Sequence, residues 1–375
     1  VQAGGSGTAL YQALITGTVA SAQSAFQLLS GEAQASLGTT LFSQNQLMAD
    51  TLDARLRQAA YVGSTGATAA LGFGGPTAYA KAPVTKAGPF TSAPPPAPAA
   101  PMWTGWAQAF GQWNSTSGNG NASSVSSTVG GFLAGADATM NNITFGFAAG
   151  YSWANSSVAN MGSSLDSDAA QFALYAGTAF GALKLRAGAN LAFNQVNSER
   201  VVVAGSVSER PNASYDGLTG GAFAEAGYAL PLGPVAFEPF AAMAWSAVQM
   251  DGFTETGAPV TGLTSSGLSF DSWYSTLGVR AASSFLLGGL ATTPHATLGW
   301  RHAYGDVTPA LAVSFLNTGT GFTVQGLPIA KDSAIVGAGV DVLLGKGLTL
   351  GVSYDGSFAS DAQSNAVRGT LGLTF

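Results

Sequence analysis

The chain has 375 residues, a net charge of −6 and no Cys; 9% of its residues are charged and 46% are hydrophobic. The acidic balance gives no electrostatic basis for nucleic-acid binding, and the lack of Cys excludes disulfides and thiolate metal sites. Soluble domains carry roughly 25% charged residues, so a Gly-rich secreted β-protein of this composition would be poorly solvated. The composition therefore favours a chain that faces lipid.

Membrane-spanning helices are not expected. No apolar run approaches the roughly 18 residues that such a helix needs. The longest candidates, 222–232 and 235–248, are interrupted by Glu225, Pro231 and Glu238. The start of the chain, Val1–Gly5, lacks the basic and apolar regions of a signal peptide. We therefore expect a mature fragment or an excised domain.

The N-terminal part predicts helices. Residues 1–31 have a Gly-rich start followed by apolar residues partly at helical spacing, and we interpret them as a helical junction. A second helix is predicted over 32–61, with Ser30 capping its first turn and Glu32 near the positive end of its dipole. Its narrow apolar stripe consists of Ala33, Leu37, Leu41, Met48, Leu52 and Leu56, and its charges are Asp50, Asp53, Arg55 and Arg57.

The helix over 32–61 would be about 45 Å long at ~1.5 Å per residue, slightly more than the ~40–45 Å of a whole bilayer. It is too polar to face lipid. It could lie in a polar tube or pack by its stripe on a soluble neighbour, and the helix alone favours the second interpretation. Residues 62–101 form a linker that ends in the Pro-rich segment 93–101, which can neither continue a helix nor join a sheet.

From Met102 to Phe375 the sequence consists of strand-like runs. Twelve are predicted, over 102–113, 125–139, 143–154, 166–180, 182–196, 214–230, 235–249, 268–286, 291–304, 333–344, 347–358 and 365–375. Apolar and polar residues alternate most clearly in the third and eleventh. Each run reaches the ~9–11 residues that a membrane-spanning strand needs.

The connections alternate in length. Tight Gly, Asn and Pro turns follow the even-numbered runs, for example Asn141-Asn142, Gly181 and Gly345–Gly347, whereas longer polar loops follow the odd-numbered runs. A meander with all short turns at one end and all long loops at the other is typical of outer-membrane barrels. A soluble sandwich has no reason to segregate its loops in this way.

The charges of the strands should point into the lumen of such a barrel, since the other face meets lipid. The predicted lumen residues are Asp137, Lys184, Arg186, Glu225, Glu238, Arg280, Arg301, Asp341, Asp355 and Arg368. Leu133, Phe223 and Phe240 share this face and could pack against something in the pore. Aromatic residues near the run ends fit interfacial girdles, and they are Trp103, Trp106, Tyr151, Trp153, Trp273, Tyr274, Trp300 and Tyr304.

The last strand alternates strictly. Phe375, Leu373 and Leu371 lie on its apolar face and Arg368 on its polar face. As the twelfth of an even set, it should pair with the first run and close the barrel.

These features resemble the autotransporter translocator, the β-domain of type Va secretion. The segments that carry the resemblance are Leu29–Ser36, Glu238–Phe240, Leu298–His302, Gly326–Ile329, Gly337–Asp341, Leu350–Gly356 and the terminal Phe375. Their order, with twelve runs, covers about residues 8–375. The Pro-rich segment 93–101 departs from the family, because it lengthens the connection between helix and barrel.

The resemblance implies a 12-stranded antiparallel transmembrane barrel (102–375) with the helix 32–61 threaded through its lumen. It implies export of an N-terminal passenger, outside this stretch of chain, to the surface of a Gram-negative cell. The implied partners are outer-membrane lipid, the passenger and the barrel-assembly machinery, which would recognise Phe375, Leu373 and Leu371. We expect a monomer with no cofactor, metal or nucleic acid.

Several alternatives remain open. Glu225, Glu238, Arg280 and Arg301 could contact the helix around Asp50–Arg57 or pair with one another across the lumen. The chain could also be a 12-stranded outer-membrane enzyme of the lipase or protease kind, or a passive pore or surface-binding barrel. The two His residues do not favour an enzyme or a metal site, because parity places His295 in the lumen and His302 toward lipid or the rim. Some relatives cut their own pore helix at an Asn; Asn45 is the candidate here, although its surroundings depart from the self-cleaving pattern.

Overall fold

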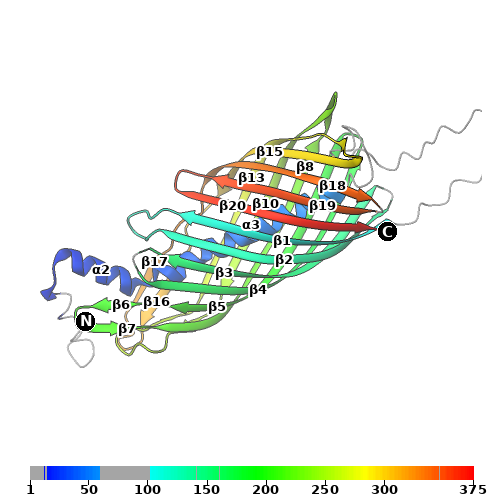
Figure 1. The fold of residues 1–375 in the computed structure, drawn as a ribbon. Coiled ribbons are helices and arrows are strands. Elements are labelled where there is room, and N and C mark those ends of the chain that lie inside the picture. The colour runs from blue at the N-terminus through cyan, green and yellow to red at the C-terminus, as the bar shows by residue number, and fades with distance from the viewer. Residues whose placement is uncertain (1–11, 13–14, 60–101, 141, 160, 346) are drawn as a thin grey trace, which may run out of the picture.

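The computed structural model describes residues 12, 15–59, 102–140, 142–159, 161–345 and 347–375. The predicted linker 62–101, most of the N-terminal start and the last two residues of the predicted pore helix lie outside the described residues. Within the described part, a closed antiparallel barrel surrounds a helix (Figure 1). The predicted fold class is thereby confirmed.

Twelve long strands of 11 to 18 residues form the barrel wall. They are β1 (Met102–Thr116), β2 (Val125–Met140), β3 (Ile143–Val158), β4 (Ser163–Phe180), β5 (Leu183–Glu199), β8 (Asn212–Tyr228), β10 (Val235–Met250), β13 (Leu268–Ala282), β15 (Leu290–Tyr304), β18 (Asp332–Gly345), β19 (Leu348–Phe358) and β20 (Ala362–Thr374). Each pairs antiparallel with its neighbours, and β20 pairs with β1 from Ala362 opposite Thr116 to Thr374 opposite Thr104. This pairing closes the sheet and leaves no free edge.

Several strands extend further into the long loops than predicted. β3 continues to Val158 and β4 begins at Ser163, and Ser157 pairs with Ser164 across them. Apart from Val158 and Leu165, the added residues are Asn and Ser, so they carry too little apolar alternation to mark them as strand. Antiparallel pairing continues because the backbone hydrogen bonds do not depend on which side chains are present.

The long loops also contain strands of their own. β6 (Val202–Ala204) and β7 (Val207–Glu209) form a hairpin, and β11 (Phe253–Thr254), β12 (Leu263–Ser265), β16 (Ala310–Phe315) and β17 (Gly321–Gln325) form a small sheet. At the opposite end, β9 (Leu230–Leu232) and β14 (Phe285–Leu287) extend two tight turns. We refer to these ends as the long-loop end and the short-turn end.

Two helices are described. α2 (Val19–Ser30) begins after Thr18, whose hydroxyl accepts a hydrogen bond from the Ser21 amide at 3.1 Å, and lies at the long-loop end (Figure 1). Gly31, with φ of 73°, separates it from α3 (Glu32–Ala59), which runs through the lumen toward the short-turn end (Figure 1). The alternative interpretation of a helix packed by one stripe on a soluble neighbour is wrong, because polar residues such as Gln34, Asn45 and Arg55 are buried as well.

Side chains alternate between an apolar outer face and a lumen filled by α3. Phe147, Phe172 and Leu174 are exposed on the outer face, whereas Leu133 and Phe223 point inward to the core around the helix. Two of the predicted girdle aromatics also point inward: Trp106 and Tyr274 are each 4% exposed. The reason is parity, because Trp106 lies three residues from Trp103, and Tyr274 directly follows Trp273, so within each pair the two side chains take opposite faces.

Candidate functional site

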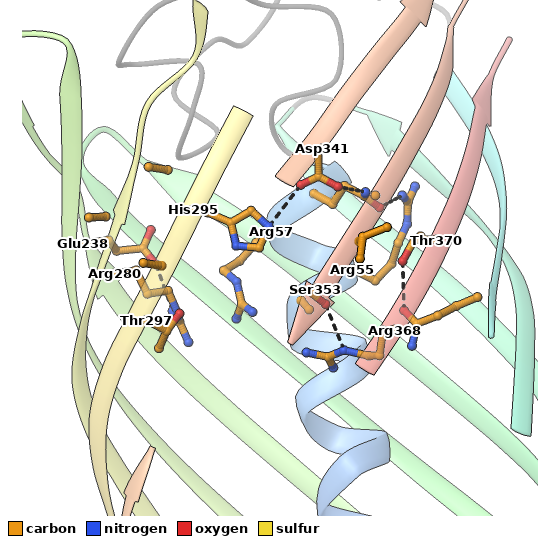
Figure 2. Close-up of a pocket in the computed structure, with 18 of the residues that line it drawn as sticks. Arg55, Arg57, Glu238, Arg280, His295, Thr297, Asp341, Ser353, Arg368 and Thr370 are labelled. Carbon is orange, nitrogen blue, oxygen red and sulfur yellow. Dashed lines mark hydrogen bonds and ion pairs between the residues drawn. The ribbon is translucent and has the colours of Figure 1, made fainter. Parts of the chain in front are cut away.

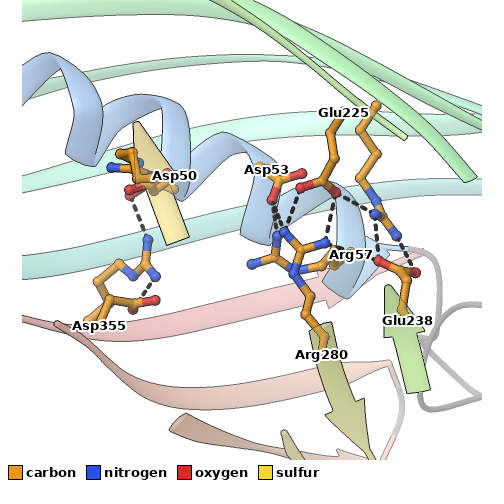
Figure 3. A network of polar contacts seen from close by, with 11 residues as sticks. Asp50, Asp53, Arg57, Glu225, Glu238, Arg280 and Asp355 are labelled. Atoms are coloured by element: carbon orange, nitrogen blue, oxygen red, sulfur yellow. Dashed lines mark hydrogen bonds and ion pairs between the residues drawn. The ribbon is translucent and has the colours of Figure 1, made fainter. Parts of the chain in front are cut away.

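The lumen contains an ion cluster that joins the barrel wall to α3. Its six members, which we call the inner ion cluster, are Asp53 and Arg57 of α3 and Arg186, Glu225, Glu238 and Arg280 of the wall (Figure 3). Arg186 binds Glu225 at 2.7 Å and Glu238 at 2.9 Å. Arg280 binds Glu225 at 2.5 Å, Glu238 at 3.0 Å and Asp53 at 3.2 Å. Asp53 also pairs with Arg57, one turn along the helix.

The strand register assembles the wall part of this cluster. Arg186 lies directly opposite Glu225 on β5 and β8, and Glu238 lies directly opposite Arg280 on β10 and β13. Opposite charges at facing positions stabilise a sheet pair. Gly227 leaves space for Glu238, since a Cβ there would lie 2.8 Å from the Glu238 carboxyl carbon. The Arg280 guanidinium also lies 3.5 Å from the centre of the Phe240 ring.

A second contact ties α3 to β2. Arg55 donates two hydrogen bonds to Asp137, at 2.7 and 3.0 Å, and both side chains are 2% exposed. Asp137 also accepts from the Tyr175 hydroxyl at 3.0 Å, and this hydroxyl accepts from Trp106 at 2.7 Å. The inward aromatics thus extend a charge pair to two further strands, β4 and β1.

Strands β15, β18 and β20 contribute three more helix contacts. Arg301 of β15 binds Asp50 at 2.8 Å, and Arg368 of β20 donates to the Thr51 hydroxyl at 3.1 Å. Near the short-turn end, Gln58 donates to Asp341 at 2.7 Å, and His295 lies 3.4 Å from the other oxygen of this carboxylate (Figure 2). These wall residues tether the helix to β15, β18 and β20, in addition to β2.

A buried ion pair holds the bend between α2 and α3 at the long-loop end. Arg200 is 1% exposed and binds Glu255 with two hydrogen bonds of 2.7 Å. Arg200 also donates to the Leu28 carbonyl at 2.7 Å, and Gln34 donates to Glu255 at 3.0 Å. We call this set, with Arg200 and Glu255 at its centre, the long-loop clasp.

Asn45 lies midway along α3 and contacts neutral groups. Its amide nitrogen donates to the Gly220 carbonyl at 3.0 Å and to the Ser246 hydroxyl at 2.6 Å, and its oxygen accepts from Asn190. These partners belong to β8, β10 and β5. The contacts therefore tether the helix to three strands.

The structure brings together most residues singled out from the sequence. The lumen charges contact α3 and also pair with one another, so both alternatives occur: Arg280 and Arg301 reach the helix, and Glu225 and Glu238 bind wall arginines. The long-loop clasp was missed, since Arg200 and Glu255 lie in polar loops without periodicity. Charged residues are rare in this chain, so the charges of Arg200 and Glu255 are the one signal that could have indicated a structural role for them.

The terminal residues lie as the alternation predicts. Leu371, Leu373 and Phe375 are 45%, 48% and 77% exposed on the outer face, while Arg368 is 3% exposed in the lumen. Within the described ranges, no cluster of three or more His, Asp or Glu residues is placed to hold a metal ion. No described helix is both long enough and apolar enough to cross a membrane.

Comparison with known proteins now identifies the family. The family model of the autotransporter beta-domain matches residues 105–355. The chain belongs to the autotransporter β-domain family. Two curated relatives, both named extracellular serine protease of Serratia marcescens, are each 33% identical to it over 271 residues. This alignment covers 72% of this chain and 26% of each relative, so the chain spans about a quarter of their length.

Solved autotransporter structures share the fold. The translocator domain of NalP from Neisseria meningitidis matches with a TM-score of 0.57 and 18% identity, over 73% of this chain and 88% of that one. The β-domain of the Bordetella autotransporter BrkA gives 0.55 and 18%, over 73% and 100%. The transport unit of AIDA-I from Escherichia coli gives 0.53 and 17%, over 72% and 89%. The autotransporter β-domain described here is an outer-membrane translocator, as predicted.

Proposed function

We propose that this domain exports a passenger, linked N-terminally to it, through the barrel, and that α3 remains in the lumen as a plug. The observation that carries the proposal is the path of α3. Its N-terminal part contacts the long-loop end, where the Leu327 amide donates to Ser36 at 3.1 Å. Its C-terminal part reaches the short-turn end through Gln58 and Asp341. A chain that precedes α2 would therefore emerge beyond the long loops.

We propose the orientation in which the long loops face the cell exterior and the tight turns face the periplasm, as is usual for outer-membrane barrels. The exposed apolar side chains of the outer face would contact membrane lipid. Phe375, Leu373 and Leu371 would be recognised by the barrel-assembly machinery at the periplasmic side. The protein would act as a monomer, because its lumen is occupied by its own helix.

We assign the chain to four parts: 1–31 as the junction with the passenger, 32–61 as the pore helix, 62–101 as a linker and 102–375 as the barrel. The domain would perform no catalysis itself. The two His residues lie on opposite faces of β15, His295 beside Asp341 in the lumen and His302 beside Asp332 on the outer face. The three neutral partners of Asn45 favour a structural role over self-cleavage, which would require a carboxylate to orient the amide.

The test is a reporter enzyme fused upstream of Val1 and produced in a Gram-negative host. A protease added to intact cells should degrade the reporter, because the reporter lies at the cell surface. The control lacks residues 32–59 and should insert a barrel whose reporter remains protected. Electrophoresis of unheated samples would show whether each barrel is folded. A folded barrel with α3 whose reporter stays in the periplasm would contradict export.

A further inference from the structure

A carboxylate and an imidazole lie among aromatic rings on the outer face of the barrel. Asp332, the first residue of β18, lies directly opposite His302 of β15. Trp300 Nε1 donates to Asp332 Oδ1 at 3.0 Å, and His302 Nδ1 lies 2.8 Å from the same oxygen. The Asp332 side chain is 56% exposed. Contact with lipid chains alone gives no reason for these two polar groups, so they point to a polar partner outside the protein.

Aromatic rings extend this group along β15 and onto β13. The centroid of the His302 ring lies 5.5 Å from that of Trp300 and 4.8 Å from that of Tyr304. Trp273 lies directly opposite Tyr304. The rings of Trp273, Trp300 and Tyr304 are about half exposed. We call Trp273, Trp300, His302, Tyr304 and Asp332 the outer aromatic site.

The outer aromatic site lies where the barrel wall ends on its long-loop side. β15 ends at Tyr304 and β18 begins at Asp332. Trp and Tyr rings are enriched at the membrane–water interface, where they lie at the level of the lipid headgroups. Nearer to the middle of the wall, Leu298 and Val336 are apolar, exposed and directly opposite one another. The group that reaches the site is therefore a lipid headgroup whose acyl chains run past these two residues.

The geometry of Asp332 favours a positively charged headgroup. Both contacts within the site end on Oδ1, and no described residue bonds to Oδ2. The carboxylate is thus held in one orientation with an acceptor available. An ammonium group can donate a charge-assisted hydrogen bond to this oxygen, and the faces of Trp and Tyr rings attract cations within about 6 Å. A lipid phosphate by itself would be repelled by the carboxylate.

Lys331 adds a positive charge beside this carboxylate. It directly precedes Asp332 and is exposed, and its carbonyl accepts a hydrogen bond from the Ala303 amide at 2.8 Å. Opposite charges at successive positions complement a zwitterionic headgroup that carries an ammonium and a phosphate. Ethanolamine and choline headgroups both carry these charges, but only the ethanolamine ammonium has N–H groups that Asp332 can bind.

We propose that the outer aromatic site binds a phospholipid with an ethanolamine headgroup. The ammonium donates to Asp332 Oδ2 and lies against the rings of Trp300 and Tyr304, and the phosphate lies near Lys331. The inference goes beyond export and is independent of the position of α3, because the whole site lies on the outer face. It can therefore fail while export holds.

The first experiment measures which lipid stays with the protein. The full chain is placed in nanodiscs that contain phosphatidylethanolamine, phosphatidylcholine and phosphatidylglycerol in equal amounts, and native mass spectrometry counts the lipids that it retains on release. Wild type should retain phosphatidylethanolamine at least about tenfold more often than either other lipid, as expected for a hydrogen bond to a charged group. Asp332→Asn should remove most of this preference.

The control for this experiment is Asp361→Asn. Asp361 is an exposed carboxylate in the loop between β19 and β20, at the same end of the barrel, so the variant loses the same charge and should keep the preference. Equal retention of the three lipids by wild type, or an unchanged preference in Asp332→Asn, overturns the proposal. Retention of phosphatidylcholine as strong as that of phosphatidylethanolamine also overturns it, because the rings alone would then account for binding. Loss of the preference in Asp361→Asn would show a general charge effect in place of a site.

The second experiment reverses the charge of the site. Asp332→Lys places an ammonium where the carboxylate was, so the ratio of retained phosphatidylethanolamine to phosphatidylglycerol should fall at least about tenfold below that of Asp332→Asn. Electrophoresis of unheated samples checks that each barrel is folded. If Asp332 only shaped the surface, both substitutions would lower the retention of all three lipids equally, and that result contradicts recognition of the ammonium.

Discussion

At the scale of single residues, charge pairing determines where α3 sits. Arg55 binds Asp137 on one wall and Asp50 binds Arg301 on the opposite wall. A buried ion pair is often no more stable than an apolar pair of similar volume, but loss of one partner is costly because it leaves an uncompensated charge. The pairs therefore contribute little to the stability of the observed helix position. Their main effect is to make other rotations of α3, and other positions along the barrel axis, unfavourable.

The long-loop clasp provides a matched prediction with two arginines. Arg200→Ala leaves Glu255 buried without its cation and should make opening of this end easier by about 3–5 kcal/mol. Arg210→Ala removes an ion pair with Glu199 whose side chains are 75% and 50% exposed, and it should cost at most about 1 kcal/mol. Limited proteolysis checks both, because cleavage follows the population of the open form. Cleavage should rise at least about 100-fold in Arg200→Ala, and comparable rates in the two variants would contradict the clasp.

The inner ion cluster makes a second prediction from two aspartates of the same helix. Asp53→Asn leaves Arg57, Arg186 and Arg280 with two carboxylates, so it should destabilise the folded barrel by about 3–5 kcal/mol. Asp50→Asn affects a pair in which the Arg301 side chain is 11% exposed and that of Asp50 is 42% exposed, so solvent screens it partly and the loss should be smaller, about 1–2 kcal/mol. The temperature at which the compact form disappears in electrophoresis measures the difference. A larger shift for Asp50→Asn would show that water does not screen this side of the helix.

At the scale of elements, the loop after β17 is fitted closely to the backbone of α3. Thr39 donates to the Leu327 carbonyl at 2.5 Å, and a Cβ at Gly326 would lie 2.6 Å from backbone atoms of Ala35 and Ser36. Gly326→Ala must therefore move the loop or the helix, and we expect a loss of about 1–3 kcal/mol. Gly321→Ala in β17 is the control, since its nearest neighbour would lie at 3.6 Å. Hydrogen exchange of α3 amides should increase in the first variant alone, and equal exchange in both would refute the close fit.

The positions of most elements could be predicted from the sequence, whereas their contacts could not. The strands follow from alternation and the loop ends from Gly and Asn, such as Asn142 with φ of 70° and Gly181 with φ of 59°. Inward facing of Arg186 and Arg280 follows from parity. The ion-pair partners of these arginines cannot be predicted in the same way. Strand tilt and helix rotation decide whether an arginine reaches Glu225, Glu238 or Asp53. β16 and β17 were also missed, because with six and five residues they are shorter than the ~9–11 residues of a membrane-spanning strand.

At the scale of the whole molecule, the pairing that closes the barrel extends to Phe375. The Phe375 amide donates to the Trp103 carbonyl at 2.9 Å, and the Trp103 amide donates to the Phe375 carbonyl at 3.2 Å. These are backbone bonds, which any residue other than Pro could make at position 375. The Phe375 side chain is 77% exposed, so it contributes little to the folded barrel and remains free for recognition by another protein.

This separation predicts that Phe375→Ser affects assembly in cells and not stability. Purified protein refolded in detergent should retain its unfolding free energy within about 0.5 kcal/mol, as is usual for exposed positions. The amount of barrel in the outer membrane should fall about tenfold, equivalent to about 1.4 kcal/mol of recognition energy. Phe180→Ser, at another exposed Phe of the short-turn end, is the control and should insert normally. Equal losses for both variants would indicate a general need for apolar surface, and poor refolding of Phe375→Ser alone would indicate a structural role for the ring.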